Sequence, residues 1–164
     1  MPATTPTPPT ACFLHGLESS SQGTKARWFE ERFPGVLLRD YEGDLDQRMT
    51  QLISQLDGRD DLVLIGSSFG GLMATQFALR YPERCRRLVL LAPALNHAGY
   101  APPAEPLDVE TVLVTGTQDT VCPPDVIVPL AQATFRRLEV QVEEDDHLLR
   151  WTFPQLDWVR LLSR

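Results

Sequence analysis

Short apolar runs alternate along the chain with longer stretches in which apolar residues recur every three or four positions. The runs are typical of strands buried on both faces, and the periodic stretches are typical of helices packed against such strands. The predicted strands are residues 11–15, 36–41, 62–65, 87–92, 111–115 and 138–142, and the predicted helices are residues 22–33, 45–56, 68–80, 125–134 and 153–162. This alternation predicts a parallel sheet with helices on both faces.

The clearest helical pattern follows Asp44. Its carboxylate is a favourable N-cap, and Gln47 stands three residues later as the partner in a capping box. Gly58 is a favourable residue at which to end the helix. The apolar residues between these signals form one stripe at helical spacing, and they are Leu45, Met49, Leu52, Ile53 and Leu56.

The connections predict a three-layer, doubly wound α/β sandwich whose six strands lie in the order 2-1-3-4-5-6. In that order the chain leaves the first and third strands in opposite directions. The loops that follow these two strands then flank the crevice in which open α/β sheets bind ligands. We expect a flexible tail rich in proline and threonine over residues 1–10 and one domain over residues 11–164.

Composition and charge narrow the class of protein. The chain has 164 residues, of which 43% are hydrophobic and 23% charged, and its net charge of −7 argues against nucleic-acid binding. No apolar run reaches the roughly 18 residues that span a bilayer, and the first residues lack the features of a signal peptide. Cys12, Cys85 and Cys122 have no metal-ligand spacing, which favours a reduced, cytoplasmic setting. The sequence leaves a monomer and a homodimer equally open.

The most informative stretch is Gly-Ser-Ser-Phe-Gly at residues 66–70. It fits G-x-S-x-G, and it stands between a predicted strand and a predicted helix. In that setting the pattern is the nucleophile elbow, a tight turn that exposes a serine hydroxyl at the edge of a sheet. Ser68 is therefore the candidate nucleophile, at the amino end of a helix where a developing negative charge is stabilised.

A serine nucleophile needs a base, and the base needs an acid that orients it. His147 follows the sixth predicted strand, so it is expected at the same edge of the sheet as Ser68. His15 is more easily explained as a structural residue at the end of the first strand, and His97 stands in a Pro/Ala loop as an ordinary loop residue or a minor part of the pocket wall.

Asp119 is the predicted acid because it follows the fifth strand at the same edge. The chain order of Ser68, Asp119 and His147 is then the order expected of α/β-hydrolases. Three other acids compete with Asp119 and stay open as alternatives, namely Asp125, Asp145 and Asp146.

An oxyanion needs two N–H donors that point at one position. The residue after the nucleophile, Phe69, supplies one, and Leu17 in the loop after the first strand supplies the other. Gly16 lets the backbone of that loop pass close to the substrate. Leu95 and Tyr100, with Met73 as a further candidate, are expected to wall a shallow acyl site, although they also fit ordinary packing.

These features together resemble the α/β-hydrolase superfamily over nearly the whole chain after the tail. They resemble most closely the small bacterial YqiA-like esterases. The matching features, in order, are His15-Gly16 followed by Ser19, Ser20 and Ser21, then residues 66–70, then Gly116 with Asp119 and Val121, and finally Asp146-His147. The resemblance implies a minimal hydrolase without a lid, because residues 93–108 are too few for the helical lid that many members insert there.

The sequence thus predicts a serine hydrolase that cleaves small carboxylic esters or thioesters through an acyl-enzyme. Its partner is a small acyl substrate, and the chemistry needs no metal or organic cofactor. An alternative is a hydrolase-fold protein that binds a small molecule with little or no turnover. Nucleotide binding fits less well, since the glycines lack both the P-loop and the G-x-G-x-x-G spacing. Cys122 is best explained as a packed loop residue.

Overall fold

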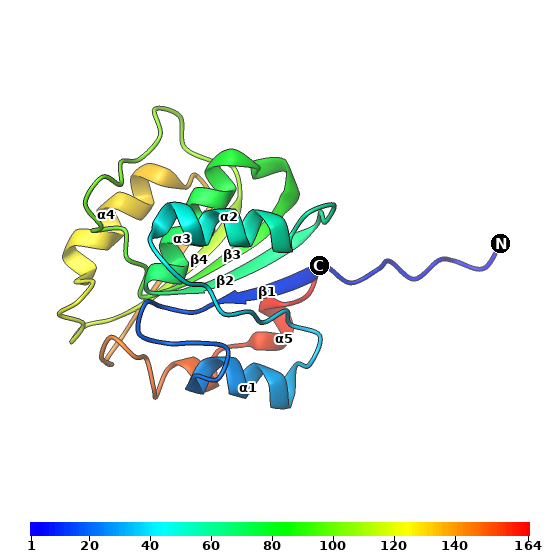
Figure 1. Ribbon diagram of the computed structural model, residues 1–164, viewed down its shortest axis with the longest axis horizontal. Coiled ribbons are helices and arrows are strands. Elements are labelled where there is room, and N and C mark those ends of the chain that lie inside the picture. Colours follow the sequence, from blue (N-terminus) through cyan, green and yellow to red (C-terminus); the bar gives the residue numbers. More distant parts are fainter.

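A five-stranded parallel sheet runs through the middle of the molecule, between two layers of helices (Figure 1). The computed structural model describes residues 1–164. The strands are β1 (Thr10–Leu14), β2 (Leu62–Ser67), β3 (Cys85–Leu91), β4 (Glu110–Gly116) and β5 (Leu138–Glu143). They lie side by side in the order β1-β2-β3-β4-β5, and all four neighbouring pairs are parallel.

The three inner strands, β2, β3 and β4, contain continuous runs of buried residues because both faces of the sheet are covered there. Successive side chains point to opposite faces, so alternate residues enter two different cores. In β2, for example, Leu62 and Leu64 belong to one buried cluster, whereas Val63 and Ile65 belong to the other. The continuous apolar pattern in the sequence is therefore explained by two cores that share one sheet.

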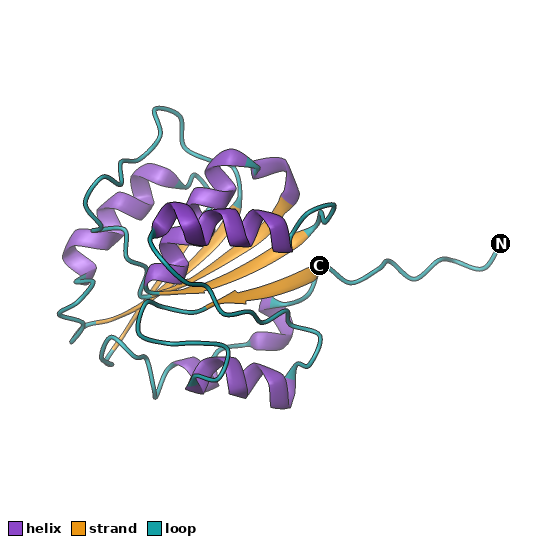
Figure 2. Cartoon of the chain, in the orientation of Figure 1, coloured by secondary structure: helices purple, strands orange, loops and turns teal.

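The helices divide into two layers, as Figure 2 shows. They are α1 (Thr24–Arg32), α2 (Leu45–Gln55), α3 (Phe69–Arg80), α4 (Pro124–Thr134) and α5 (Trp158–Leu161), with short 3₁₀ turns η1 (Pro82–Arg84) and η2 (Phe153–Gln155). Helices α2, α3 and α4 cover one face, and α1 and α5 cover the other (Figure 1). The capping box predicted for α2 is present, because Asp44 Oδ1 accepts from the Gln47 N–H at 2.9 Å and Gln47 Oε1 accepts from the Asp44 N–H at 2.8 Å.

The predicted second strand, residues 36–41, is wrong as a full strand. Only Leu37 pairs with the outer edge of β1, as an isolated bridge to Cys12. The pairing does not resume at Tyr41, whose N–H donates to His15 Nε2 at 2.9 Å, so this backbone group bonds to a side chain and not to a strand. The segment still lies where the predicted order put it, but the sheet has five strands and not six.

The single closing helix predicted for residues 153–162 is also wrong. The segment forms the 3₁₀ turn η2 and then the one-turn helix α5. Asp157 separates them, since its side chain caps a new turn by accepting from the Arg160 N–H at 3.1 Å. Phe153, Trp158 and Leu161 are nevertheless buried, so the segment packs against the sheet although it does not form one helix.

The parallel arrangement brings the carboxyl ends of all five strands to one edge of the sheet. The strand arrowheads point to that edge in Figure 1, while the chain termini lie at the opposite side. The loops after β1, β2, β4 and β5 therefore gather beside the start of α3. No helix has both the length and the apolar character required to cross a membrane.

Candidate active site

Ser68 lies in a strained turn between β2 and α3. Its backbone has φ 54° and ψ −114°, outside the conformations that non-glycine residues usually adopt. The flanking glycines make this turn possible, since a side-chain carbon on Gly66 would collide with the backbone of Gly70, and one on Gly70 with the carbonyl of Leu14. The local geometry is that of the nucleophile elbow that the sequence predicted.

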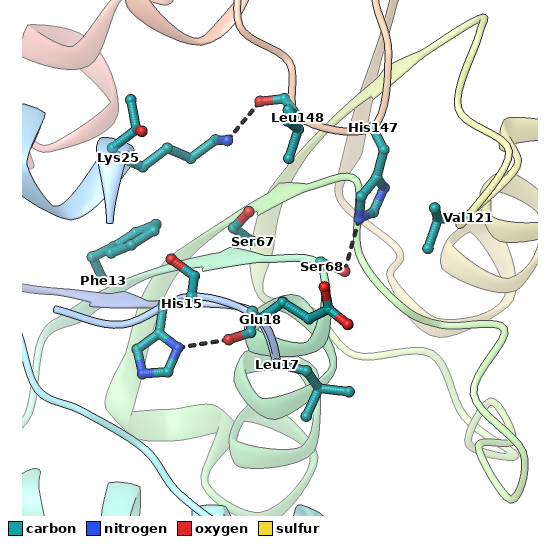
Figure 3. Close-up of a pocket in the computed structure, with 13 residues that line it drawn as sticks. Phe13, His15, Leu17, Glu18, Lys25, Ser67, Ser68, Val121, His147 and Leu148 are labelled. Atoms are coloured by element: carbon teal, nitrogen blue, oxygen red, sulfur yellow. Dashed lines mark hydrogen bonds between the residues drawn. The ribbon is translucent and has the colours of Figure 1, made fainter. Parts of the chain in front are cut away.

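Three polar side chains from different loops meet at this turn. Ser68 Oγ lies 3.0 Å from His147 Nε2, and His147 Nδ1 lies 2.7 Å from Asp119 Oδ2. Because the carboxylate oxygen accepts, Nδ1 carries the proton, and Nε2 then accepts from the serine hydroxyl. The Asp119 side chain is fully buried, whereas 21% of the His147 side chain is exposed. Figure 3 shows the imidazole of His147 directed at Ser68.

The loop after β4 fixes the orientation of Asp119. Its Oδ1 atom accepts from the Val121 N–H at 2.9 Å and from the Cys122 N–H at 2.8 Å. The second oxygen, Oδ2, is left to face His147. Because Oδ1 is held by the backbone, Oδ2 has a fixed position from which it keeps the His147 imidazole in one tautomer and one orientation.

The competing acids have other partners. Asp145 is 2% exposed, and its two oxygens accept from the backbone N–H groups of Asp146, Trp151 and Thr152. Burial would raise the pKa of Asp145, but these hydrogen bonds outweigh it and hold the pKa below its usual value. Asp146 Oδ1 accepts from the Leu148 N–H, and Asp125 is exposed in the first turn of α4.

The other two histidines are structural. His15 is buried, and because its Nε2 accepts from the Tyr41 N–H, its Nδ1 donates to the Gly16 carbonyl oxygen at 2.6 Å. It therefore shapes the loop after β1, as the sequence suggested. His97 is exposed and packs edge-on against the Phe69 ring, with 5.6 Å between ring centroids.

Two backbone N–H groups beside Ser68 are available to a ligand. Phe69 is the first residue of α3, so its N–H has no acceptor within the helix. The Leu17 N–H donates to no group of the protein. Gly16 brings this loop against the elbow, because a side-chain carbon built on it would lie 3.5 Å from Ser68 Cβ.

A cavity of about 480 Å³ opens beside Ser68, between the loop after β1 and the loop that carries His147 (Figure 3). Its lining combines apolar side chains with hydroxyls and two charged groups. The lining residues that matter here are Phe13, Leu17, Glu18, Lys25, Val121 and Leu148. Sequence reasoning missed all of these except Leu17, although Lys25 carries a signal in being the only lysine of the chain.

Two residues predicted to wall the acyl site do not line this cavity. Leu95 is 1% exposed and packs in the core on the α3 side of the sheet. The Tyr100 hydroxyl bonds to Thr134 in α4. Their loop follows β3 and turns toward α4, so it does not reach the cavity, which opens toward α1.

Cys122 is close to the site but unsuited to act as a nucleophile. It is 2% exposed, and burial, with an added contribution from the Asp119 carboxylate, raises the pKa of its thiol to about 11. The thiol is therefore protonated at neutral pH, which agrees with its interpretation as a packed loop residue.

Comparison with known proteins assigns the fold to a family. Residues 18–106, more than half of the chain, match the family model for the alpha/beta hydrolase fold. The chain belongs to this alpha/beta hydrolase family. The matched range of this hydrolase-fold protein contains the elbow; it begins one residue after Leu17 and ends before Asp119 and His147. The family match therefore includes Ser68. Asp119 and His147 lie outside it, and their place beside Ser68 comes from the geometry alone.

The matches to curated relatives are short. The chain is 39% identical over 69 residues to homoserine O-acetyltransferase of Thermus thermophilus, and 49% identical over 51 residues to pimeloyl-[acyl-carrier protein] methyl ester esterase of Shewanella woodyi. These segments cover 42% and 31% of this chain. The chain spans less than a fifth of the length of these relatives, 17% and 19% respectively.

Solved structures match over nearly the whole chain. Mouse alpha/beta hydrolase domain-containing protein 10 superposes with a TM-score of 0.78 at 19% identity, over 94% of this chain and 91% of that one. Monoacylglycerol lipase of Paleococcus ferrophilus gives a TM-score of 0.74 at 14% identity, over 94% and 96% of the two chains. At such identities the likeness shows the shared fold.

Proposed function

We propose that this protein is a serine hydrolase that cleaves small carboxylic esters or thioesters through an acyl-enzyme. The observation that carries the proposal is the line of hydrogen bonds from Ser68 through His147 to Asp119. Such a line makes a serine hydroxyl nucleophilic, because the imidazole accepts its proton as the oxygen attacks. Membership of the hydrolase family, with relatives named esterase and lipase, supports the same reaction class.

In the proposed first half-reaction, Ser68 Oγ attacks the carbonyl carbon of the substrate. The hydroxyl proton moves to His147 Nε2, and Asp119 stabilises the imidazolium that forms. The oxyanion of the tetrahedral intermediate accepts from the Leu17 and Phe69 N–H groups, each worth roughly 10²–10³ in rate. The bond from carbon to the leaving oxygen or sulfur then breaks, and His147 donates its proton to the departing alcohol or thiol.

In the second half-reaction, water enters the open cavity and attacks the acyl carbon on Ser68. His147 accepts a proton from the water and returns it to Ser68 Oγ as the bond from acyl carbon to serine breaks. A carboxylic acid leaves and the resting enzyme is restored. The partly exposed His147 side chain gives water a route to the position that this step requires.

The decisive experiment replaces Ser68 with alanine. We expect Ser68→Ala to lower turnover of a short p-nitrophenyl ester by roughly 10⁴–10⁶-fold, because the nucleophile is lost. Ser54→Ala is the matched control, since Ser54 is an exposed serine on α2. A fluorophosphonate probe should also modify Ser68, as peptide mass spectrometry would reveal. Equal rates for Ser68→Ala and the parent protein would contradict the proposal.

Acyl transfer to an alcohol is a second candidate, favoured by the match to homoserine O-acetyltransferase. It uses the same acyl-enzyme but an alcohol in place of water in the second half-reaction. The two are separated by offering esters and thioesters of graded acyl length with and without a small alcohol. If the protein is a hydrolase, it yields free acid at the same rate with and without the alcohol. If it is a transferase, it yields a new ester, and the rate of substrate consumption rises when the alcohol is added.

A further inference from the structure

The only lysine of the chain lines the cavity beside Ser68. The protein has 15 basic residues, and all except Lys25 are arginines. Lys25 lies in the first turn of α1, and its side chain reaches across the end of the cavity nearest that helix (Figure 3). The one compact ammonium group of the protein is thus found in the same cavity as the candidate nucleophile.

The Lys25 ammonium group is incompletely used by the protein. Nζ donates to the Leu148 carbonyl oxygen at 2.6 Å and lies 5.4 Å from the centroid of the Phe153 ring. It makes no other hydrogen bond and no ion pair within the chain. An ammonium group has three N–H donors, so two remain available to a molecule that occupies the cavity.

The carboxylates closest to Lys25 are bound to other groups. Burial lowers the pKa of Lys25 below its ordinary value, and the opposing charges of Asp145 and Asp146 do not cancel this effect. The oxygens of Asp145 accept backbone N–H groups, and Asp146 pairs with Arg150 at 3.6 Å. The positive charge of Lys25 is therefore partly desolvated and without a direct counter-ion, an arrangement that an incoming anion would relieve.

The remaining lining suits a short apolar chain between Ser68 and Lys25. Phe13 and Leu148 line the cavity with Lys25, and Ser68 and His147 belong to the same lining. The other charged residue of the cavity, Glu18, points away from Lys25 toward Val121 in Figure 3. The cavity thus has an ammonium group at its α1 end and the reactive hydroxyl within the same space.

We propose that Lys25 is a specificity-determining residue that binds an anionic group on the substrate, such as a carboxylate at the far end of a short acyl chain. This inference rests on the serine-hydrolase function proposed above and names its substrate class. The acyl methylenes would contact Phe13 and Leu148, while the terminal carboxylate accepts from Lys25 Nζ. An anion on the leaving group has the same chemistry, and the experiment separates the two positions.

The test compares pairs of esters that differ only in charge. The p-nitrophenyl monoester of adipic acid and p-nitrophenyl hexanoate place the charge on the acyl chain, and 4-acetoxybenzoate and 4-acetoxybenzamide place it on the leaving group. We expect the parent protein to favour the charged member of one pair in kcat/KM by about 10- to 100-fold, as suits a hydrogen bond between charged groups. The favoured pair identifies the side of the ester that faces Lys25.

Two variants connect the preference to the ammonium charge. Lys25→Met keeps the length and the apolar stem of the side chain and should abolish the preference, so that the ratio of kcat/KM for the charged ester to kcat/KM for its neutral partner falls to about one. Lys25→Arg keeps the charge and should retain most of the preference. The inference is overturned if the parent protein shows no preference, or if Lys25→Met slows charged and neutral esters equally, since Lys25 would then only hold the Leu148 carbonyl.

A binding measurement separates failure of this inference from failure of the proposed function. Reductive methylation with ¹³C-formaldehyde keeps the charge and labels one side chain besides the terminal amine, because Lys25 is the only lysine. In Ser68→Ala protein, monoethyl adipate should shift the Lys25 resonance and ethyl hexanoate should not. That result without ester turnover would reject the hydrolase function and keep the anion site, whereas no shift with either monoethyl adipate or 4-acetoxybenzoate would reject the anion site.

Discussion

Ser68 shows how a single residue can be held in a strained backbone conformation. Its backbone conformation costs of order 1–3 kcal/mol, and the surrounding structure must maintain it. Two hydrogen bonds do so, from the Ser68 N–H to the Leu91 carbonyl oxygen and from the Ala94 N–H to the Ser68 carbonyl oxygen, each at 2.9 Å. The strain at this residue is therefore supported by β3 and the loop that follows it.

Asp119 allows a prediction at the same scale. In Asp119→Asn the amide oxygen can still accept from Val121 and Cys122, but the NH₂ group then faces His147 Nδ1. The imidazole must take the other tautomer, in which Nε2 carries a proton and cannot accept one from Ser68. We expect kcat for ester hydrolysis to fall by about 10³–10⁴-fold at neutral pH, measured at saturating substrate.

The matched control is Asp146→Asn, the same chemical change at the residue next to His147. Its side chain is partly exposed, and an asparagine oxygen can still accept from the Leu148 N–H. We expect less than about a threefold change in kcat, because surface substitutions away from the reacting groups have small effects. If kcat fell strongly in Asp146→Asn and only slightly in Asp119→Asn, Asp146 and not Asp119 would be the acid that orients His147.

At the scale of elements, the loop between β5 and η2 decides where His147 lies. The loop contains no helix or strand of its own, and Asp145 orders it by accepting three backbone N–H groups with its two oxygens. The Asp145 carbonyl oxygen also accepts from the Gln118 N–H at 3.0 Å, which joins the loop to the segment that carries Asp119. One buried carboxylate therefore organises the loop that presents the imidazole.

Asp145→Ala should both destabilise the protein and impair the site. Three partly buried backbone hydrogen bonds lose their acceptor, and we expect the free energy of unfolding to fall by about 1–3 kcal/mol, measured by urea denaturation. We also expect kcat to fall at least about tenfold in the folded protein, since His147 loses its fixed position. Unchanged kcat in the folded variant would show that the loop is held by other contacts.

The same carboxylate gives a pH dependence with a definite sign. The pKa of Asp145 is lower in the folded protein than its ordinary value near 3.8, so the folded state binds this proton less readily than the unfolded chain. Its contribution to stability is therefore complete above about pH 4 and is lost as the pH falls further through the folded pKa. The stability difference between the parent protein and Asp145→Ala should accordingly shrink below pH 4.

At the scale of the whole molecule, two separate cores stabilise opposite faces of the sheet. The face covered by α1 depends on the C-terminal segment, which is too short and too interrupted to form a full helix. An aromatic cluster completes this face, in which the Trp158 ring lies 4.9 Å from Phe29 and 5.1 Å from Phe153 between centroids. Packing of large rings thus substitutes for regular secondary structure.

Trp158→Ala should be costly for this reason. The side chain is 3% exposed, and removing it leaves a cavity among aromatic neighbours. We expect a loss of about 3–5 kcal/mol in the free energy of unfolding, measured by circular dichroism in urea. Val159→Ala is the control in the same turn, because Val159 is 73% exposed and its loss should change stability by less than about 0.5 kcal/mol. Equal losses of unfolding free energy in Trp158→Ala and Val159→Ala would contradict the burial of Trp158 in the aromatic cluster.

The amino-acid sequence by itself determined the features that depend on local pattern. The elbow at Ser68 was predictable because its glycines are required by a turn within five residues, and the capping box of α2 because its two partners are three residues apart. The strands buried on both faces were predictable because their apolar runs reflect two cores. Asp119 and His147 were predictable as candidates from the edge of the sheet at which their loops begin.

Only the tertiary structure decided which of these candidates meet. Asp119 and Asp145 are both buried acids, and the contacts of their oxygens distinguish the one that faces His147 from the one that holds its loop. The segment around Leu37 makes only one bridge to β1, and the N–H of Tyr41 beyond it donates to the distant side chain of His15. Lys25 joined the cavity through the position of α1. Such outcomes depend on contacts between segments far apart in the chain, and a local pattern carries no information about them.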